Sequence, residues 1–191
     1  MCYLRRDDDT AAELLPLRLI MSVVLIAAIM VLVMIAAGHL QVFFAEQSVD
    51  RQCHELLADL GTMVVDGAFR DLNSLSETEG AKRVFSFLLP DSLVYLCLGG
   101  DPDPLGDGHL TTGLVQDGAV IVYRIQGGSK HVMWLPMETY HFRLGVFLNQ
   151  HWTISGEEQS LLICDGGRVD LVFECVQRYH EHFILVHHVN I

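Results

Sequence analysis

The spacing of apolar and polar residues changes twice along the chain, and each change marks a different kind of element. Residues 19–37 include no charged side chain, and Ser22 is their one polar residue. At about 1.5 Å of rise per helical residue, this run spans roughly the 30 Å hydrocarbon core of a bilayer. A helix in a soluble core would show a polar face, and this run has none. The pattern predicts one membrane-spanning helix.

Beyond this run the pattern becomes that of an amphipathic helix. Apolar residues recur at spacings of four and three, with charged residues off the stripe. The stripe consists of Val49, Cys53, Leu56, Leu60 and Met63. No proline interrupts the chain here, so we predict one continuous helix from about Pro16 to about Val65. Asp66-Gly67 supplies a glycine stop.

From about residue 82 the period is that of short β-strands. Single strands are predicted at Val84–Leu89, Leu93–Leu98 and Phe183–Val189. Two further pairs of runs flank Gly127-Gly128 and Gly166-Gly167, and Gly-Gly between alternating runs favours a hairpin.

Pairing the runs about these turns predicts which side chains share a face. In the first hairpin, Tyr123 should lie beside Val132, and Arg124 should share the other face with His131. In the second hairpin, Cys164 should lie beside Val169 on the apolar face, as a core thiol or half of a disulfide would.

Seven or eight short strands without a second helix predict an α+β protein. It would consist of one long N-terminal transmembrane and amphipathic helix followed by an all-β antiparallel sandwich-like domain. The predicted organisation is a cytoplasmic tail (1–18), a transmembrane helix (19–39), an amphipathic helix extension (40–66), a connector (67–81) and an extracellular β-sandwich domain (82–191).

The orientation follows from the basic residues at the two ends of the membrane segment. Arg5, Arg6 and Arg18 precede it, whereas Arg51 is the one basic residue in the fifteen that follow. The positive-inside rule therefore places the N-terminus in the cytoplasm and the β domain outside. A cleaved secretory signal, with Ala36-Ala37-Gly38 as its processing site, is the alternative.

The charge balance restricts the class of partner. The chain has 24 acidic and 12 basic residues, a formal net charge of −12. Such an excess of acidic residues argues against nucleic acid and anionic lipid as partners and favours solubility or cation binding.

Cysteine usage leaves two readings open. Cys53, Cys97, Cys164 and Cys175 all fall in the predicted extracellular part, where two disulfides are allowed. Buried free thiols explain the same four residues.

A Gly/Pro loop with three carboxylates is the candidate metal site. Asp101, Asp103 and Asp107 lie between predicted strands, and hard cations prefer several oxygen ligands on a tightly turned backbone. Calcium is therefore the candidate ligand, and a solvated turn is the alternative. Because Leu105 and Thr112 occupy positions where an EF-hand has ligands, the loop is no EF-hand.

Two other groups of residues have the spacing or order of metal and enzyme sites. His180 and His182 alternate at a strand start, so two imidazoles could hold zinc or copper, although surface histidines explain them equally well. His109, Cys164 and Arg178 occur in the order found in sortase-type transpeptidases, whose chemistry needs a supported thiolate and a cationic partner. No other catalytic set or cofactor fingerprint stands out.

The N-terminal stretch resembles a known family. Asp8-Asp9-Thr10-Ala11-Ala12-Glu13-Leu14-Leu15-Pro16-Leu17-Arg18-Leu19-Ile20 resembles the entry segment of archaeal type IV pilin-like membrane proteins, in which acidic and small residues precede a Leu-Pro-x-Arg-Leu step. The match covers about the first forty residues, and the β domain matches in architecture alone. In that class the apolar helices bundle into a filament core or anchor a minor component.

The resemblance implies a non-enzymatic, membrane-anchored module that presents a β domain at the cell surface. Its partners would be the lipid bilayer and further pilin-like subunits, including copies of itself. Prepilin peptidases cut after a small residue, here Ala11 or Ala12, and neither follows a basic residue. An uncleaved anchor therefore stays open beside a filament subunit, as do a sortase-like enzyme and a calcium-binding adhesion domain. We expect no catalysis and no cofactor apart from the candidate calcium ion.

Overall fold

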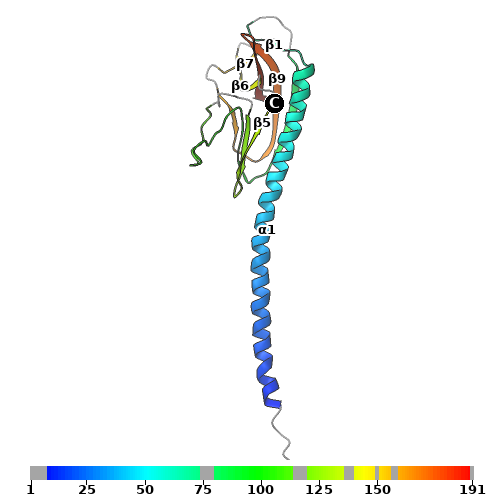
Figure 1. Ribbon diagram of the computed structural model, residues 1–191, viewed down its shortest axis with the longest axis vertical. Coiled ribbons are helices and arrows are strands. Elements are labelled where there is room, and N and C mark those ends of the chain that lie inside the picture. The colour runs from blue at the N-terminus through cyan, green and yellow to red at the C-terminus, as the bar shows by residue number, and fades with distance from the viewer. Residues whose placement is uncertain are drawn as a thin grey trace, which may run out of the picture. The chain divides into compact units, whose positions relative to one another are not determined.

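The computed structural model describes residues 8–73, 80–113, 120–135, 140–148, 151–155 and 159–189. It divides into two compact units, residues 1–41 and 42–191. A single helix, α1 (Asp8–Asp66), provides the first unit and continues into the second (Figure 1). The α+β class, with one long N-terminal helix before a β domain, is confirmed.

In the first unit, α1 presents apolar side chains on every side. The large apolar residues from Leu19 to Ile35 are between 51% and 74% exposed. Ser22 Oγ donates to the carbonyl oxygen of Arg18 over 2.8 Å, which satisfies the polar group of the run within the helix. By length and composition, α1 is the one helix among the described residues that could cross a membrane. It begins at Asp8, earlier than the predicted start near Pro16.

In the second unit, α1 buries the predicted stripe. All five residues, Val49, Cys53, Leu56, Leu60 and Met63, are at most 2% exposed and join the core of the β domain. The prediction from the spacing is therefore confirmed. The helix ends at Asp66, and Gly67 follows it closely packed, because a Cβ there would clash with the Met63 carbonyl oxygen.

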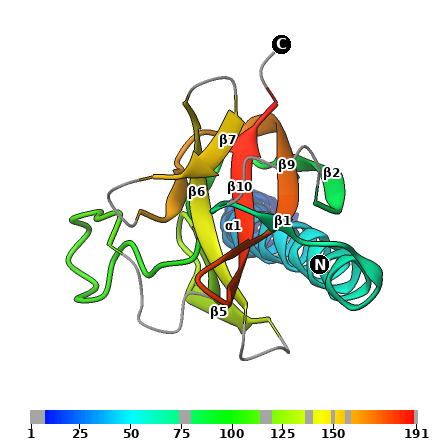
Figure 2. The same ribbon diagram turned by 90° about the horizontal axis from the view of Figure 1, so that it is seen from above.

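Ten strands are described after α1. Their bounds are β1 (Arg70–Asp71), β2 (Lys82–Leu89), β3 (Leu93–Leu98), β4 (Val120–Ile125), β5 (Lys130–Trp134), β6 (Tyr140–Leu148), β7 (His151–Ile154), β8 (Leu161–Ile163), β9 (Gly167–Arg178) and β10 (Glu181–His188). They form two sheets. The larger has the order β1-β9-β10-β6-β7, with β2 also paired to β9, and the smaller has the order β5-β4-β3-β8. Figure 2 shows β6, β10, β9 and β2 in sequence across the larger sheet.

The larger sheet is mixed, whereas the sequence predicted antiparallel pairing throughout. β10 runs parallel to β6, and the short β1 runs parallel to β9. Three strands intervene between β6 and β10, and the chain returns to the edge of β6 in the same direction. Alternation along a strand assigns its faces but not its partner, which is why the sequence pattern missed these pairs.

The first predicted hairpin forms, but its register is one residue away from the prediction. Tyr123 lies opposite His131, and Arg124 lies opposite Lys130, so Val132 and Trp134 belong to the outer face. The loop at Gly127 turns with a φ of +79°, and Gly128 N–H donates to the Ile125 carbonyl oxygen. A one-residue slip moves every side chain of a strand to the opposite face.

The second predicted hairpin does not form, so the expected pairing of Cys164 with Val169 is wrong. β8 pairs with β3 in the smaller sheet, whereas β9 pairs with β10, β2 and β1 in the larger one. Gly166 packs against the backbone of Pro90 and Asp91, where a Cβ would approach Asp91 Cα to 2.7 Å. The Gly166-Gly167 step is therefore a corner at which the chain changes sheet.

One side chain of α1 caps the outer edge of β2. Gln52 Nε2 donates to the Leu88 carbonyl oxygen over 3.0 Å, and Leu88 N–H donates to Gln52 Oε1 over 2.6 Å. The amide thus replaces the backbone partner that an additional strand would provide. Edge strands with open backbone groups favour aggregation, and Gln52 protects this one where the helix passes it.

Candidate functional site

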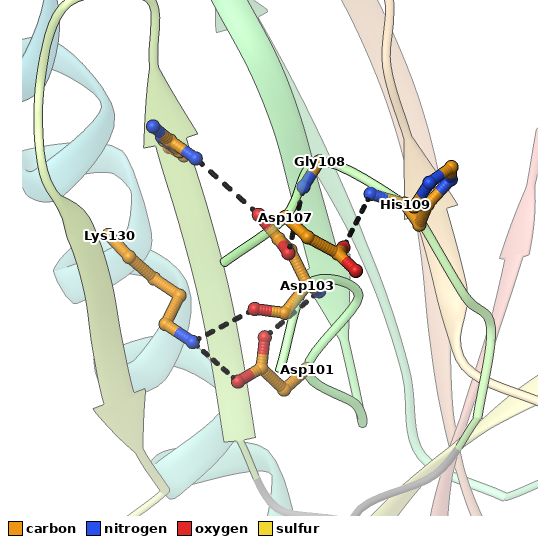
Figure 3. Close-up of polar contacts among 7 residues, drawn as sticks. Asp101, Asp103, Asp107, Gly108, His109 and Lys130 are labelled. Carbon is orange, nitrogen blue, oxygen red and sulfur yellow. Dashed lines mark hydrogen bonds and ion pairs between the residues drawn. The ribbon is translucent and has the colours of Figure 1, made fainter. Parts of the chain in front are cut away.

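The acidic loop lies over the outer face of the smaller sheet, and its carboxylates are bound by basic side chains. Lys130 Nζ lies 2.7 Å from Asp101 Oδ2 and 3.2 Å from the carbonyl oxygen of Asp103 (Figure 3). Asp103 is 1% exposed, and its Oδ2 lies 3.4 Å from Arg124 Nη1. Both bases come from the β4–β5 hairpin, whose outer face carries them because of the register described above.

The third carboxylate has a local role. Asp107 Oδ1 accepts the backbone N–H of His109 over 2.9 Å, an Asx-type turn. Asp103 Oδ1 accepts the N–H of Gly108, five residues farther along the loop, at 3.3 Å. Gly106 and Gly108 have φ values of +70° and +81°, which a glycine adopts without strain.

These contacts do not favour the calcium hypothesis for Asp101, Asp103 and Asp107. Lys130 and Arg124 already neutralise the carboxylates of Asp101 and Asp103, whose negative charge would otherwise attract a metal ion. Among the described residues, no group of three or more His, Cys, Asp or Glu side chains is arranged to hold a metal ion. The loop therefore acts as a folded cover for the sheet.

Beneath this cover, Tyr95 is fully buried with Val120 and Val122. Its hydroxyl has no hydrogen-bond partner in the part of the chain that the structure describes. Burial raises the pKa of Tyr95, and the charges of Asp101 and Asp103 raise it further. The phenol is therefore held neutral.

A second polar cluster lies on the outer face of the larger sheet, and its pairing was not predicted from the sequence. Glu174 of β9 is 1% exposed and pairs with Arg70 of β1 through two hydrogen bonds, of 2.7 and 2.9 Å. Arg70 also donates to the carbonyl oxygen of Trp152 in β7 over 2.8 Å. One guanidinium thereby ties together three strands that are far apart in the sequence.

His187 and Trp152 stack beside this ion pair. Their ring centroids lie 3.5 Å apart with planes 7° from parallel, and His187 is 6% exposed. Burial lowers the pKa of His187 most, and the charges of Lys82 and His188 lower it further, whereas the hydrogen bond to the His188 carbonyl oxygen and the charge of Glu174 raise it. The imidazole is therefore held neutral against the indole.

This burial predicts a pH dependence. The folded state holds His187 neutral, whereas in the unfolded chain it binds a proton below its ordinary pKa of 6.5. The unfolded state then binds more protons, so the stability of the fold should fall as the pH drops through 6.5 towards the lowered pKa of the folded state. A His187→Phe variant keeps an aromatic ring beside Trp152 and removes this titration.

The measurement is the free energy of unfolding of both proteins at about pH 7.5 and about pH 5.5, followed by Trp fluorescence. The variant should lose less stability on acidification than the parent. Equal losses in the two proteins would show that His187 is not the responsible group.

The pKa of Cys164 is shifted in the direction opposite to the one that the sortase-like alternative requires. Cys164 is exposed after β8, and partial burial and the charge of Asp165 raise its pKa. A nucleophilic thiolate needs the opposite shift. Arg178 ends β9 in the other sheet and stacks over Tyr179, 5.4 Å from the ring centre. Cys53, Cys97, Cys164 and Cys175 are all free thiols, and all except Cys164 are buried.

The histidines at the chain's last hairpin do not converge. His180 occupies the β9–β10 turn with a φ of +70°, whereas His182 stacks on Phe69 and Tyr140. The structure therefore assigns His182 to packing, in place of the zinc or copper site that the sequence suggested as one reading.

The chain matches no protein-family model, and comparisons with curated proteins and with solved structures found no significant match.

Proposed function

We propose that the protein is a single-pass membrane anchor that presents its β domain on the extracellular side as a non-enzymatic surface module. One observation carries this proposal. A single unbroken helix has exposed large apolar side chains from Leu19 to Ile35 and, farther along, an apolar stripe that is buried in the core of the β domain.

The energetics support a lipid environment for the first part. Each large apolar side chain that leaves water gains about 1.5–3 kcal/mol, and the run from Leu19 to Ile35 has more than ten of them exposed. A bilayer supplies the missing apolar surroundings for a helix of this length.

A filament subunit of the archaeal pilin-like kind is the second candidate, because the same layout would allow apolar helices to bundle. Arg18 weighs against it. In a filament core its guanidinium would need a carboxylate partner, since a buried unpaired charge is costly. Glu13 could provide that partner only if processing occurs before it. We therefore favour the uncleaved anchor.

Topology is tested by labelling intact cells with a membrane-impermeant maleimide. Leu105 is 84% exposed in the acidic loop, so Leu105→Cys should be labelled in a background with Cys2→Ser and Cys164→Ser. A matched protein that keeps Cys2 and lacks Cys164 should be labelled only after lysis. Labelling of Leu105→Cys that also requires lysis would contradict the proposed orientation.

Intact-mass measurement of the native protein separates the anchor from the filament subunit. An anchor retains residues 1–13, whereas prepilin processing after Ala11 or Ala12 would remove them up to that point. We expect the mass of the unprocessed N-terminus. A mass reduced by the first eleven or twelve residues would make the filament subunit the leading function.

A further inference from the structure

We propose that the β domain rests directly on the lipid surface through a small apolar contact at its junction with the anchor. The contact, here called the rim, consists of Phe43, Phe44 and the β4–β5 turn at Gln126–Ser129. This inference rests on the proposed function, since it takes α1 to span a bilayer. Its partner is the boundary between lipid headgroups and acyl chains.

The uncharged stretch is longer than the hydrocarbon core. Arg18 and Glu46 are consecutive charged residues in the sequence, with Leu19–Ala45 between them. These 27 residues form continuous helix, which at about 1.5 Å per residue is roughly 40 Å long, against a core of about 30 Å. The part of the helix that exceeds the hydrocarbon core extends into the headgroup region. A bilayer is about 40–45 Å thick when its headgroup regions are included.

Two exposed aromatic rings lie at the far end of this stretch. Phe43 is 55% exposed and Phe44 is 60% exposed, and their rings meet edge to face at 5.8 Å. Apolar rings next to a membrane segment gain free energy by entering the headgroup and acyl-chain boundary. If the β domain stood clear of the lipid, both rings would remain in water.

The β4–β5 turn is fixed beside these rings by contacts within the second unit. A Cβ placed on Gly127 would lie 3.5 Å from Val42 Cγ2. Glu46 Oε1 accepts the N–H of Ser129 over 3.1 Å and lies 3.2 Å from His131 Nε2. Val42 and Glu46 are one helical turn apart and bracket the two rings. The turn is therefore level with the rings whatever the tilt of the membrane segment.

The charged side chain nearest to this junction contacts the β domain. Glu46, the first charged residue after the uncharged stretch, is 21% exposed at its side chain and contacts the turn. The rim itself contains no Asp, Glu, Lys or Arg. Its attraction to lipid is therefore apolar and should not depend on anionic lipid or on salt, unlike adsorption through basic residues.

The test uses the full chain reconstituted in phosphatidylcholine vesicles. Trp134 and Trp152 are its two tryptophans, and both are replaced by Phe. One Trp is then introduced at Phe44, at Gln126, at Ile26 within the span or at Arg51, whose side chain is 73% exposed farther along α1. Circular dichroism checks that each variant keeps its fold. Quenching is measured with lipids brominated near the headgroup and with lipids brominated near the acyl end.

We expect Phe44→Trp and Gln126→Trp to lose about half of their emission to the shallow quencher and less to the deep one. Ile26→Trp should respond most to the deep quencher, and Arg51→Trp to neither. The same result is expected with added anionic lipid and at high salt.

The outcomes separate the two proposals. If Ile26→Trp is quenched and Phe44→Trp is not, the rim is wrong and the anchor stands. If Gln126→Trp alone is unquenched, the turn does not belong to the contact. If Arg51→Trp is quenched as strongly as Phe44→Trp, the contact is not confined to the rim and the inference fails. If Ile26→Trp is unquenched, the membrane anchor itself is overturned.

Discussion

Replacing Leu56 by aspartate is expected to detach the helix extension from the β domain and to lower the free energy of unfolding by several kcal/mol. Leu56 is 1% exposed in the centre of the stripe. Removing a buried leucine side chain costs about 2–5 kcal/mol, and an unpaired carboxylate in the same place adds a desolvation cost. The change is measured by urea unfolding of the full chain in detergent.

Ala58→Asp is the matched control, because Ala58 is exposed on the same helix two residues away. A surface substitution of this kind should alter the free energy of unfolding by about 0.5 kcal/mol or less. If Leu56→Asp unfolds at the same urea concentration as the parent, the stripe does not hold the helix to the β domain.

The sequence predicted the helix best, because its two periods are local. The uncharged run and the four-three spacing of the stripe each depend on neighbouring residues, and both helix parts formed as expected. The glycine stop at Gly67 is equally local. Strand existence was likewise predictable: β2, β3 and β10 coincide with the expected runs within about two residues.

Strand pairing could not be predicted in the same way. The Gly166-Gly167 step has the composition of a hairpin turn, yet it is a corner between sheets, because Gly166 is needed for its close approach to Pro90 and Asp91. That contact joins residues more than seventy positions apart. The register error at Gly127 had a local cause. Tyr123 pairs with His131 and not with the predicted Val132, and this shift of one residue moves every side chain of β5 to the opposite face.

The candidate site depended on the same kind of long-range information. The sequence correctly grouped Asp101, Asp103 and Asp107 in one loop, but it could not place Lys130 and Arg124 against them. Glu174 did carry a signal, since it is a single acid within the apolar run Val172–Val176. A charge in a buried strand requires a partner, but its identity as Arg70 follows from the pairing of β1 with β9.

Removing that partner should produce the second large loss of stability. Arg70→Met takes both hydrogen bonds from the buried carboxylate of Glu174 and one from the carbonyl oxygen of Trp152. Breaking a buried ion pair from one side costs about 3–5 kcal/mol, because the remaining charge has lost its compensation. Urea unfolding of the full chain in detergent measures the change, and a similar loss should follow from Glu174→Leu, which leaves the Arg70 guanidinium without its carboxylate partner.

Two comparisons identify the pair as the cause. Arg83→Met removes an exposed arginine from the neighbouring strand β2 and should change the free energy of unfolding by about 0.5 kcal/mol or less. The double variant Arg70→Met/Glu174→Leu removes both charges, and apolar replacement of a whole buried pair is often neutral or stabilising. Its stability should therefore exceed that of Arg70→Met alone. A double variant as unstable as the sum of the two single changes would show that Arg70 and Glu174 act independently, and that the guanidinium contributes by packing against β7 and β9 and not by neutralising the carboxylate.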